Sequence, residues 1–159
     1  MASANFAGLK GKRAEREMVK ILQPVVAKAW ATVGGMPATC PVLSRNLVQS
    51  RQGGYDLVGL DWLALEVKHH ETLKVRDWWI QALRQARTDQ TPVLVYKKNN
   101  VKWRAVVWGY VPAGPLRVRC PVDIDLESFL LWFEHQTIAE LKKAAIQVPP
   151  LPNAQVLPV

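Results

Sequence analysis

The segment Tyr55–Lys68, which reads Y-D-L-V-G-L-D-W-L-A-L-E-V-K, constrains the fold more than any other, because charged side chains interrupt an apolar run. Alternation with a period of two residues predicts one strand before Asp61 and a second strand after it. If the turn is centred near Asp61, Asp56 and Glu66 are cross-strand neighbours with Cβ atoms about 4.5–5.5 Å apart. The segment therefore predicts a hairpin that holds two carboxylates side by side.

Two carboxylates this close repel each other, and the flanking Leu and Val side chains keep them from water. A divalent cation between Asp56 and Glu66 would remove the repulsion. Mg²⁺ suits such a pair, because it takes oxygen ligands at about 2.0–2.1 Å and retains several waters. Lys68 shares a strand face with Glu66, where its ammonium would assist a water nucleophile and stabilise a phosphoryl transition state. The alternative is that Glu66 and Lys68 form only a solvated ion pair.

Helical periodicity over residues 11–31 predicts an amphipathic helix. At about 100° per residue, Glu15 falls about 36° from the centre of the apolar arc and Glu17 about 124° from it. Glu15 is therefore expected to face the core and Glu17 to face away. A carboxylate that faces the core needs a partner, which a metal site would provide, although an acid at a helix start is also favoured by the helix dipole. Pro24 is expected to kink or shorten the helix.

The charge of the chain indicates an anionic partner. Its 159 residues suffice for one ordinary domain, and they carry a net charge of +8. Nucleic acid is the usual partner of a basic domain, although a run of cations is also often just a solvated face. The candidate phosphate contacts lie in the basic lead, on the first helix and in the polar loop over 44–54: Lys10, Lys12, Arg13, Arg16, Lys20, Arg45 and Arg51.

Other features of the sequence indicate the cellular compartment of the protein and the kinds of site that it lacks. No apolar run approaches the length of a membrane span, and the start of the chain lacks a signal-peptide core, so we expect a cytoplasmic protein. Cys40 and Cys120 are far apart and lack metal-ligand spacing, which favours two small buried side chains over a disulfide or a zinc site. His69 and His70 follow the second strand of the hairpin and are interpreted as loop residues, because a site of oxygen ligands does not need them.

The order of predicted elements is that of an α/β fold with a mixed sheet. Strands are expected over 38–43, the hairpin, 91–96 and 102–111, and helices over 75–89 and 126–145, the last with Asp125 as its N-cap. Residues 112–121 are expected to form a turn-rich connection. We expect one domain over 1–147, with 1–10 as a flexible basic lead and 148–159 as an extended or disordered proline-rich tail.

The pattern G-Y-D-L-V-x(7)-E-V-K, preceded by the helical segment A-E-R-E-M-V-x-x-L, resembles the core of the PD-(D/E)-x-K nucleases. Within that superfamily the chain resembles the small Holliday-junction resolvases of archaea and their phage-encoded relatives. The resemblance covers residues 11–85, about half of the chain. Tyr55 stands where the superfamily has Pro, so the match begins at Asp56.

The resemblance implies a restriction-endonuclease-like fold and a Mg²⁺-dependent DNA endonuclease that resolves four-way junctions, with Mn²⁺ able to substitute. Water would attack the backbone phosphorus and the 3′ oxygen would leave. In this interpretation Asp56, Glu66 and the Val67 carbonyl hold the metal, Lys68 orients or activates the water, and Glu15 completes the acidic cluster. The family also has a Gln on the helix after the E-x-K strand, here Gln81, and a serine in the loop before the hairpin, here Ser44 or Ser50. The resemblance further implies a homodimer.

Three alternatives remain open at this point. The chain would instead be another nuclease of the same superfamily, such as a restriction-like or repair enzyme. A non-catalytic DNA-binding module with the same fold would use Glu66 and Lys68 only as a surface pair. A basic interaction protein would recruit its partner through the tail. None of these interpretations requires a membrane or a small-molecule cofactor.

Overall fold

The structure is a computed structural model, and it describes residues 2–48 and 54–147. The elements follow in the order α1 (Ala2–Thr32), the 3₁₀ turn η1 (Pro37–Thr39), β1 (Ser44–Arg45), β2 (Leu57–Val58), β3 (Leu63–His69), α3 (Val75–Gln85), β4 (Thr91–Lys97), β5 (Arg104–Ala113), β6 (Leu116–Asp125) and α4 (Leu126–Gln147). The predicted tail over 148–159 lies outside the described residues.

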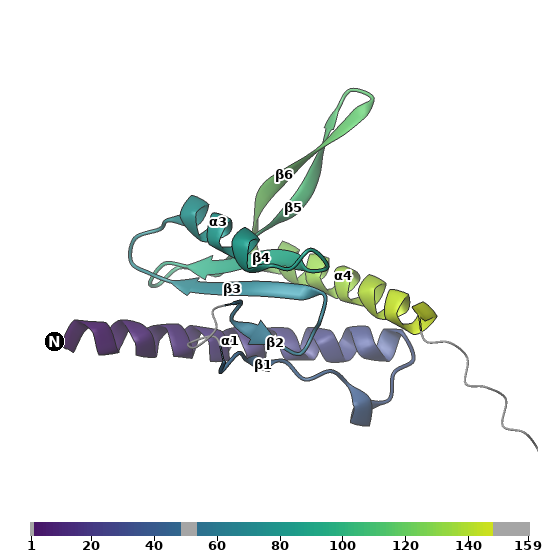
Figure 1. Ribbon diagram of the computed structural model, residues 1–159, viewed down its shortest axis with the longest axis horizontal. Helices are drawn as coiled ribbons and strands as arrows, with labels where there is room; N and C mark the ends of the chain where they lie inside the picture. The colour runs from purple at the N-terminus through teal and green to yellow at the C-terminus, as the bar shows by residue number, and fades with distance from the viewer. Residues whose placement is uncertain (1, 49–53, 148–159) are drawn as a thin grey trace, which may run out of the picture.

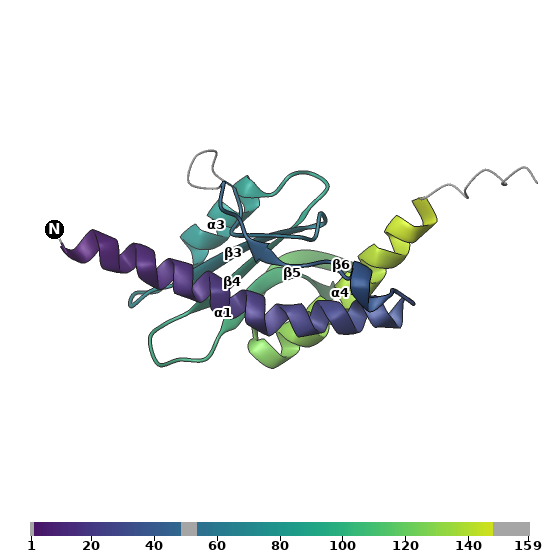
Figure 2. The same cartoon turned by 90° about the horizontal axis from the view of Figure 1, so that it is seen from below.

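A four-stranded sheet in the order β3-β4-β5-β6 forms the centre of the molecule. β3 and β4 are parallel, with Glu66 opposite Leu94, and the other neighbours are antiparallel, so the sheet is mixed. Figures 1 and 2 show α1 and α4 on one side of the sheet and α3 on the other. The expectation of an α/β fold with a mixed sheet between helices is confirmed.

Alternation along the strands divides the interior into two cores. On the side of α1 and α4, Leu65 and Val67 of β3 pack with Met18 and Leu22 of α1 and with Phe129 of α4. On the other side, the α3 residues Trp78, Trp79 and Ala82 pack with the β4 residues Leu94 and Tyr96 and with Val106 of β5. Burying both faces explains why β3 and β4 read as nearly continuous apolar runs.

The first helix is longer than the sequence indicated. Ala14, Met18, Leu22, Val26 and Ala29 recur every three or four residues and are almost fully buried, so one apolar stripe fixes the helix along its length. The helix begins at Ala2, so most of the expected flexible lead over 1–10 forms its first turns. The expectation that Pro24 shortens the helix is wrong, because the helix continues to Thr32 with Pro24 on its exposed side.

The region between β5 and α4 also differs from expectation. Residues 112–121 form part of a β-hairpin rather than a turn-rich connection, with Gly109 paired to Cys120 and Ala113 to Leu116. We call residues 109–120 of this hairpin the arm, which projects away from the rest of the molecule (Figure 1). The prolines do not prevent pairing, because each strand of the arm has a neighbour on one side only, as edge strands do.

The strand predicted over 38–43 is absent. The 3₁₀ turn η1 occupies part of it, and β1 begins at Ser44, inside the segment expected to be a loop. The helix predicted over 75–89 ends at Gln85. Asp125 caps α4 as expected, since its Oδ1 accepts a hydrogen bond from the Ser128 N–H at 2.7 Å.

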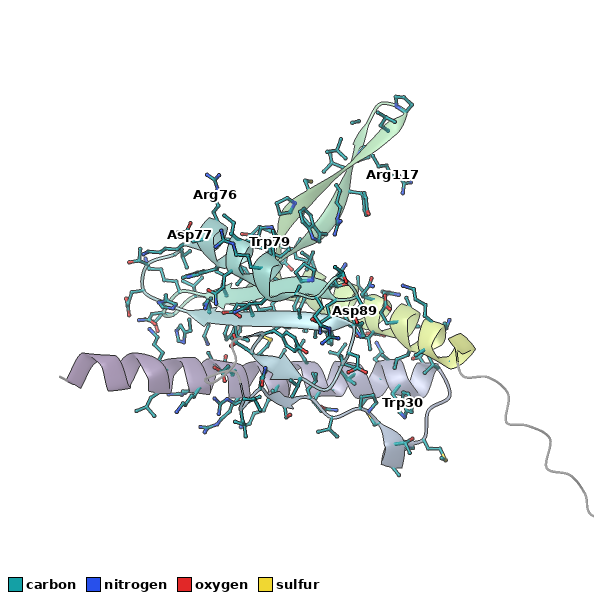
Figure 3. All side chains as sticks on the ribbon, viewed as in Figure 1. Trp30, Arg76, Asp77, Trp79, Asp89 and Arg117 are labelled. Carbon is teal, nitrogen blue, oxygen red and sulfur yellow. The ribbon has the colours of Figure 1, made fainter. Side chains whose placement is uncertain are left out.

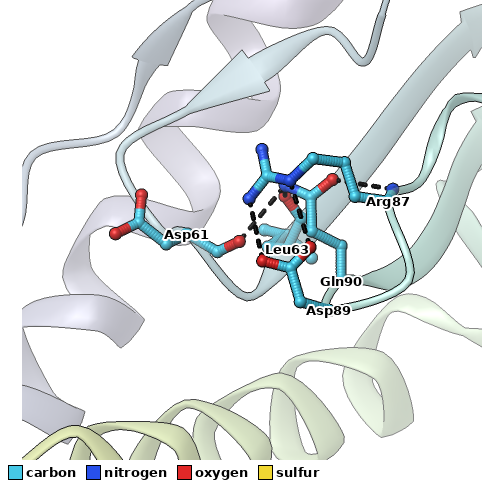
Figure 4. Close-up of polar contacts among 5 residues, drawn as sticks. All are labelled: Asp61, Leu63, Arg87, Asp89 and Gln90. Atoms are coloured by element: carbon cyan, nitrogen blue, oxygen red, sulfur yellow. Dashed lines mark hydrogen bonds and ion pairs between the residues drawn. The ribbon is translucent and has the colours of Figure 1, made fainter.

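Hydrogen bonds connect the turn between α3 and β4 to the start of β3 (Figure 4). Gln90 is buried, and its Nε2 donates to the backbone carbonyls of Asp61 at 3.2 Å and Leu63 at 3.3 Å. Its Oε1 accepts from the Arg87 N–H at 3.1 Å. These bonds hold the start of β3 at a fixed position relative to β4.

The described helices include none that is long and apolar enough to cross a membrane. Cys40 and Cys120 are free thiols, and both are partly exposed rather than buried as expected.

Candidate functional site

Asp56, directly before β2, and Glu66 of β3 lie side by side at the edge of the four-stranded sheet. The Asp56 N–H donates to the Leu65 carbonyl at 2.9 Å, and the Val67 N–H donates to Asp56 Oδ2 at 2.6 Å. Asp56 therefore lies beside Glu66 as predicted, but the predicted hairpin is wrong, because β2 pairs with β1 in a separate two-stranded sheet and not with β3. Both are buried, with exposed fractions of 5% for Asp56 and 1% for Glu66.

A glycine makes the reversal between these strands possible. Gly59 has a φ of +121°, and a Cβ there would lie 2.2 Å from the Val42 carbonyl oxygen. Any side chain would push the turn away from Val42. The position of Asp56 at the edge of β3 depends on this close approach.

Glu66 has one satisfied oxygen and one that is not. Its Oε1 contacts Lys68 Nζ at 2.5 Å and accepts from Gln81 Nε2 at 2.9 Å. Its Oε2 is buried and has no hydrogen-bond partner among the described residues. Burial of the carboxyl, followed by the negative charge of Asp56, raises the pKa of Glu66 to about 7, although Lys68 opposes the change. Burial and the charge of Asp56 therefore outweigh the stabilisation that Lys68 gives to the ionised carboxylate.

One cavity of about 720 Å³ collects the expected site residues: Glu15, Asp56, Glu66, Val67, Lys68 and Gln81. They come from α1, the segment before β2, β3 and α3, which meet at the end of β3. Residues separated by more than sixty positions in the sequence thus face one space. The placement of Gln81 agrees with what the resemblance implied.

Glu15 lines the cavity and forms an ion pair there. Its carboxylate contacts Arg45 of β1, and the two side chains are 15% and 19% exposed. The inward direction predicted for Glu15 is confirmed, and its role as a metal ligand stays a prediction. Arg45, expected to contact phosphate, instead holds Glu15 in this structure.

Glu17 lies outside the core as expected, with its side chain 39% exposed, but it is bound by other residues rather than free in solvent. Its carboxylate accepts from Lys97 Nζ at 2.9 Å and from Trp103 Nε1 at 2.8 Å. Burial alone would raise the pKa of Glu17, but the hydrogen bonds from Lys97 and Trp103 outweigh it and lower the pKa. The apolar arc did not reveal this, because the partners of Glu17 are polar groups on β4 and beside β5.

Several cavity residues were not predicted. His70, Thr72 and Lys74 line the wall between β3 and α3. The His70 ring lies 5.1 Å from that of Trp78, and burial followed by the charge of Lys68 lowers the pKa of His70. Their only signal in the sequence was their position directly after the E-x-K strand. Trp78 itself is buried, which agrees with core packing.

The basic side chains of α1 lie mostly in solvent. Lys12, Arg13, Arg16 and Lys20 are exposed, while Lys10 is partly buried at 3.7 Å from Glu71. Contact of these residues with DNA stays a prediction. Ser44 is exposed on β1 and does not line the cavity, whereas Ser50 and Arg51 lie outside the described residues.

A comparison with protein-family models finds no match for the chain, and a comparison with curated proteins also finds none. Within residues 2–48 and 54–147, no group of three or more His, Cys, Asp and Glu side chains is arranged to hold a metal ion.

Proposed function

We propose that the chain is a Mg²⁺-dependent DNA endonuclease with a restriction-endonuclease-like core. The observation that carries the proposal is the cavity at the end of β3, which gathers two adjacent carboxylates, a lysine and a glutamine from elements far apart in the sequence. Buried carboxylates with perturbed pKa values in a cavity are more frequent in functional sites than elsewhere.

The residues fit a divalent cation. Glu66 Oε2 is buried without a hydrogen-bond partner among the described residues, and burial, followed by the neighbouring charge of Asp56, raises the pKa of Glu66. A cation between the two carboxylates would satisfy that oxygen and offset the repulsion. Asp56, Glu66 and the Val67 carbonyl would hold Mg²⁺ or Mn²⁺, which would supply positive charge to the transition state and acidify water.

Three side chains of the protein have further roles in the proposed reaction. Lys68 Nζ, held at Glu66, would place a cation near the non-bridging oxygens of the pentacoordinate phosphorus, which carry the negative charge of the transition state. Lys68 also orients the attacking water. Gln81 donates to Glu66 and fixes the direction of its carboxylate. Glu15, paired with Arg45, adds negative charge to the same cavity.

The substrate that we propose is a four-way DNA junction, cut by a homodimer. The support is the resemblance of the acidic segments to the resolvases, together with a net charge of +8 and the exposed basic face of α1. A nuclease for linear or flapped duplex would use the same cavity. A non-catalytic DNA-binding module is the second candidate, because the basic face would serve it equally well.

Cleavage of labelled DNA tests the proposal. The protein is incubated with a four-way junction or a matched linear duplex, in Mg²⁺ or in chelator. We expect paired nicks in the junction that require the metal. Glu66→Gln should abolish cutting and retain junction binding, whereas Glu127→Gln, which alters an exposed acid on α4, should cut normally. Unchanged cutting by Glu66→Gln would refute the site, and metal-dependent binding without cutting would favour the second candidate.

A further inference from the structure

A second cavity, of about 620 Å³, lies next to the candidate site. The first half of α1 and the turn between β4 and β5 form its walls, and Lys10, His69 and Glu71 line both cavities. Because these residues are shared, the two cavities are neighbours and a chain-like ligand can occupy both.

The charged groups of this second cavity leave an excess of positive charge. Lys10, Arg13 and Lys97 line it together with the carboxylates of Glu17 and Glu71. Glu17 is already bound by Lys97, whereas Glu71 is 71% exposed and 3.7 Å from Lys10. Arg13 forms no ion pair with any described residue, so its guanidinium is available to an anion.

The turn after β4 adds neutral donors to the opposite wall. Asn99 and Asn100 line the cavity, and each side-chain amide carries two N–H donors. Asn100 has a φ of +58°, a left-handed conformation that asparagine tolerates better than most residues. Lys97 is the last residue of β4, and its Nζ lies 4.6 Å from the centre of the Trp103 ring. Amide donors and a guanidinium around one space suit the oxygens of a phosphodiester.

We propose that this cavity binds a backbone phosphate next to the one that is cut, so that one DNA strand runs from the β4–β5 turn past Lys10 into the candidate site. The inference rests on the proposed function. It makes Arg13 and Asn99 positioning residues, which set the place of the strand without touching the reacting atoms. It also explains why the basic start of α1 and the K-K-N-N turn, far apart in sequence, lie on either side of one hollow.

Binding in chelator, without cleavage, tests the subsite directly. Fluorescence anisotropy with a labelled four-way junction is measured over a range of salt concentrations for the wild type, Arg13→Ala and Asn99→Asp. We expect Arg13→Ala to weaken binding about 10-fold and to reduce the salt slope by about 1. Asn99→Asp keeps the size and turn preference of asparagine, and it should weaken binding by a similar factor through charge repulsion. Lys142→Ala removes one exposed charge from α4 and should bind as the wild type does.

A modified substrate locates the contact on the strand. Junctions that carry one uncharged methylphosphonate at successive positions should show a single position where the wild type loses affinity and Arg13→Ala does not. If Arg13→Ala and Asn99→Asp both bind as tightly as Lys142→Ala, the subsite is refuted even when cleavage is normal. If the wild type does not cut but the methylphosphonate effect depends on Arg13, the proposed nuclease activity fails and the phosphate subsite stands.

Discussion

The raised pKa of Glu66 predicts that its ionisation destabilises the fold in the absence of metal. The pKa rises from 4.5 to about 7 on folding, because the carboxyl is buried and lies beside Asp56. Between those values the unfolded chain loses the proton and the folded chain keeps it, so the free energy of unfolding falls as pH rises. At 1.36 kcal/mol for each pKa unit, the full loss is about 3 kcal/mol, complete above pH 7.

Glu66→Gln removes this ionisation and keeps the shape of the side chain. Urea unfolding in chelator at pH 4, 5, 6, 7 and 8 should therefore show that the wild type loses about 3 kcal/mol more than Glu66→Gln does. Taking the difference between the two proteins cancels groups that titrate in both, such as His70. Parallel pH profiles for the two proteins would show that Glu66 is not perturbed, and the electrostatic argument for a cation would fail with it.

Three further predictions follow from the geometry, besides the test of the phosphate subsite by Arg13→Ala. Cutting of junction DNA should require Mg²⁺ and Glu66, and persistent cutting by Glu66→Gln would contradict the site. Mg²⁺ at 100 times its dissociation constant should stabilise the wild type by about 2.7 kcal/mol in thermal unfolding, and Asp56→Asn should lose most of that gain; equal gains would place the metal elsewhere. Leu22→Ala, in the buried stripe of α1, should cost about 2–5 kcal/mol in urea unfolding, whereas Leu9→Ala at an exposed position should cost little, and similar costs would contradict the packing of α1.

The sequence predicted those parts of the site that depend on residues close together in the chain. Asp56 and Glu66 are ten positions apart on either side of one reversal, so strand periodicity and a turn sufficed to place them together, although β2 pairs with β1 and not with β3. Glu15 followed from helical periodicity, because its direction relative to the apolar stripe is a property of the helix alone. Gln81 followed only from the resemblance, since its sequence position does not tell which part of the sheet its helix faces.

The unpredictable part depended on tertiary partners. Glu17 lies far from the centre of the apolar arc, yet Lys97 and Trp103 draw it toward the sheet. Such contacts join positions about eighty residues apart and leave no periodic signal. Turn residues were equally misleading in the hairpin of β5 and β6, where Pro112 and Pro121 indicated a connection but are accommodated in strands that pair on one side only.

The arm adds little to the free energy that keeps the domain folded. Neither core includes a residue between 109 and 121. Tyr110, Val111, Leu116 and Val118 on it are exposed, and Arg117 extends outward (Figure 3). Its backbone amides are protected only by bonds between its own two strands, so they should exchange with solvent far sooner than those of β3 and β4. In the arm the chain thus keeps apolar side chains and free strand edges in water, a standing risk of self-association.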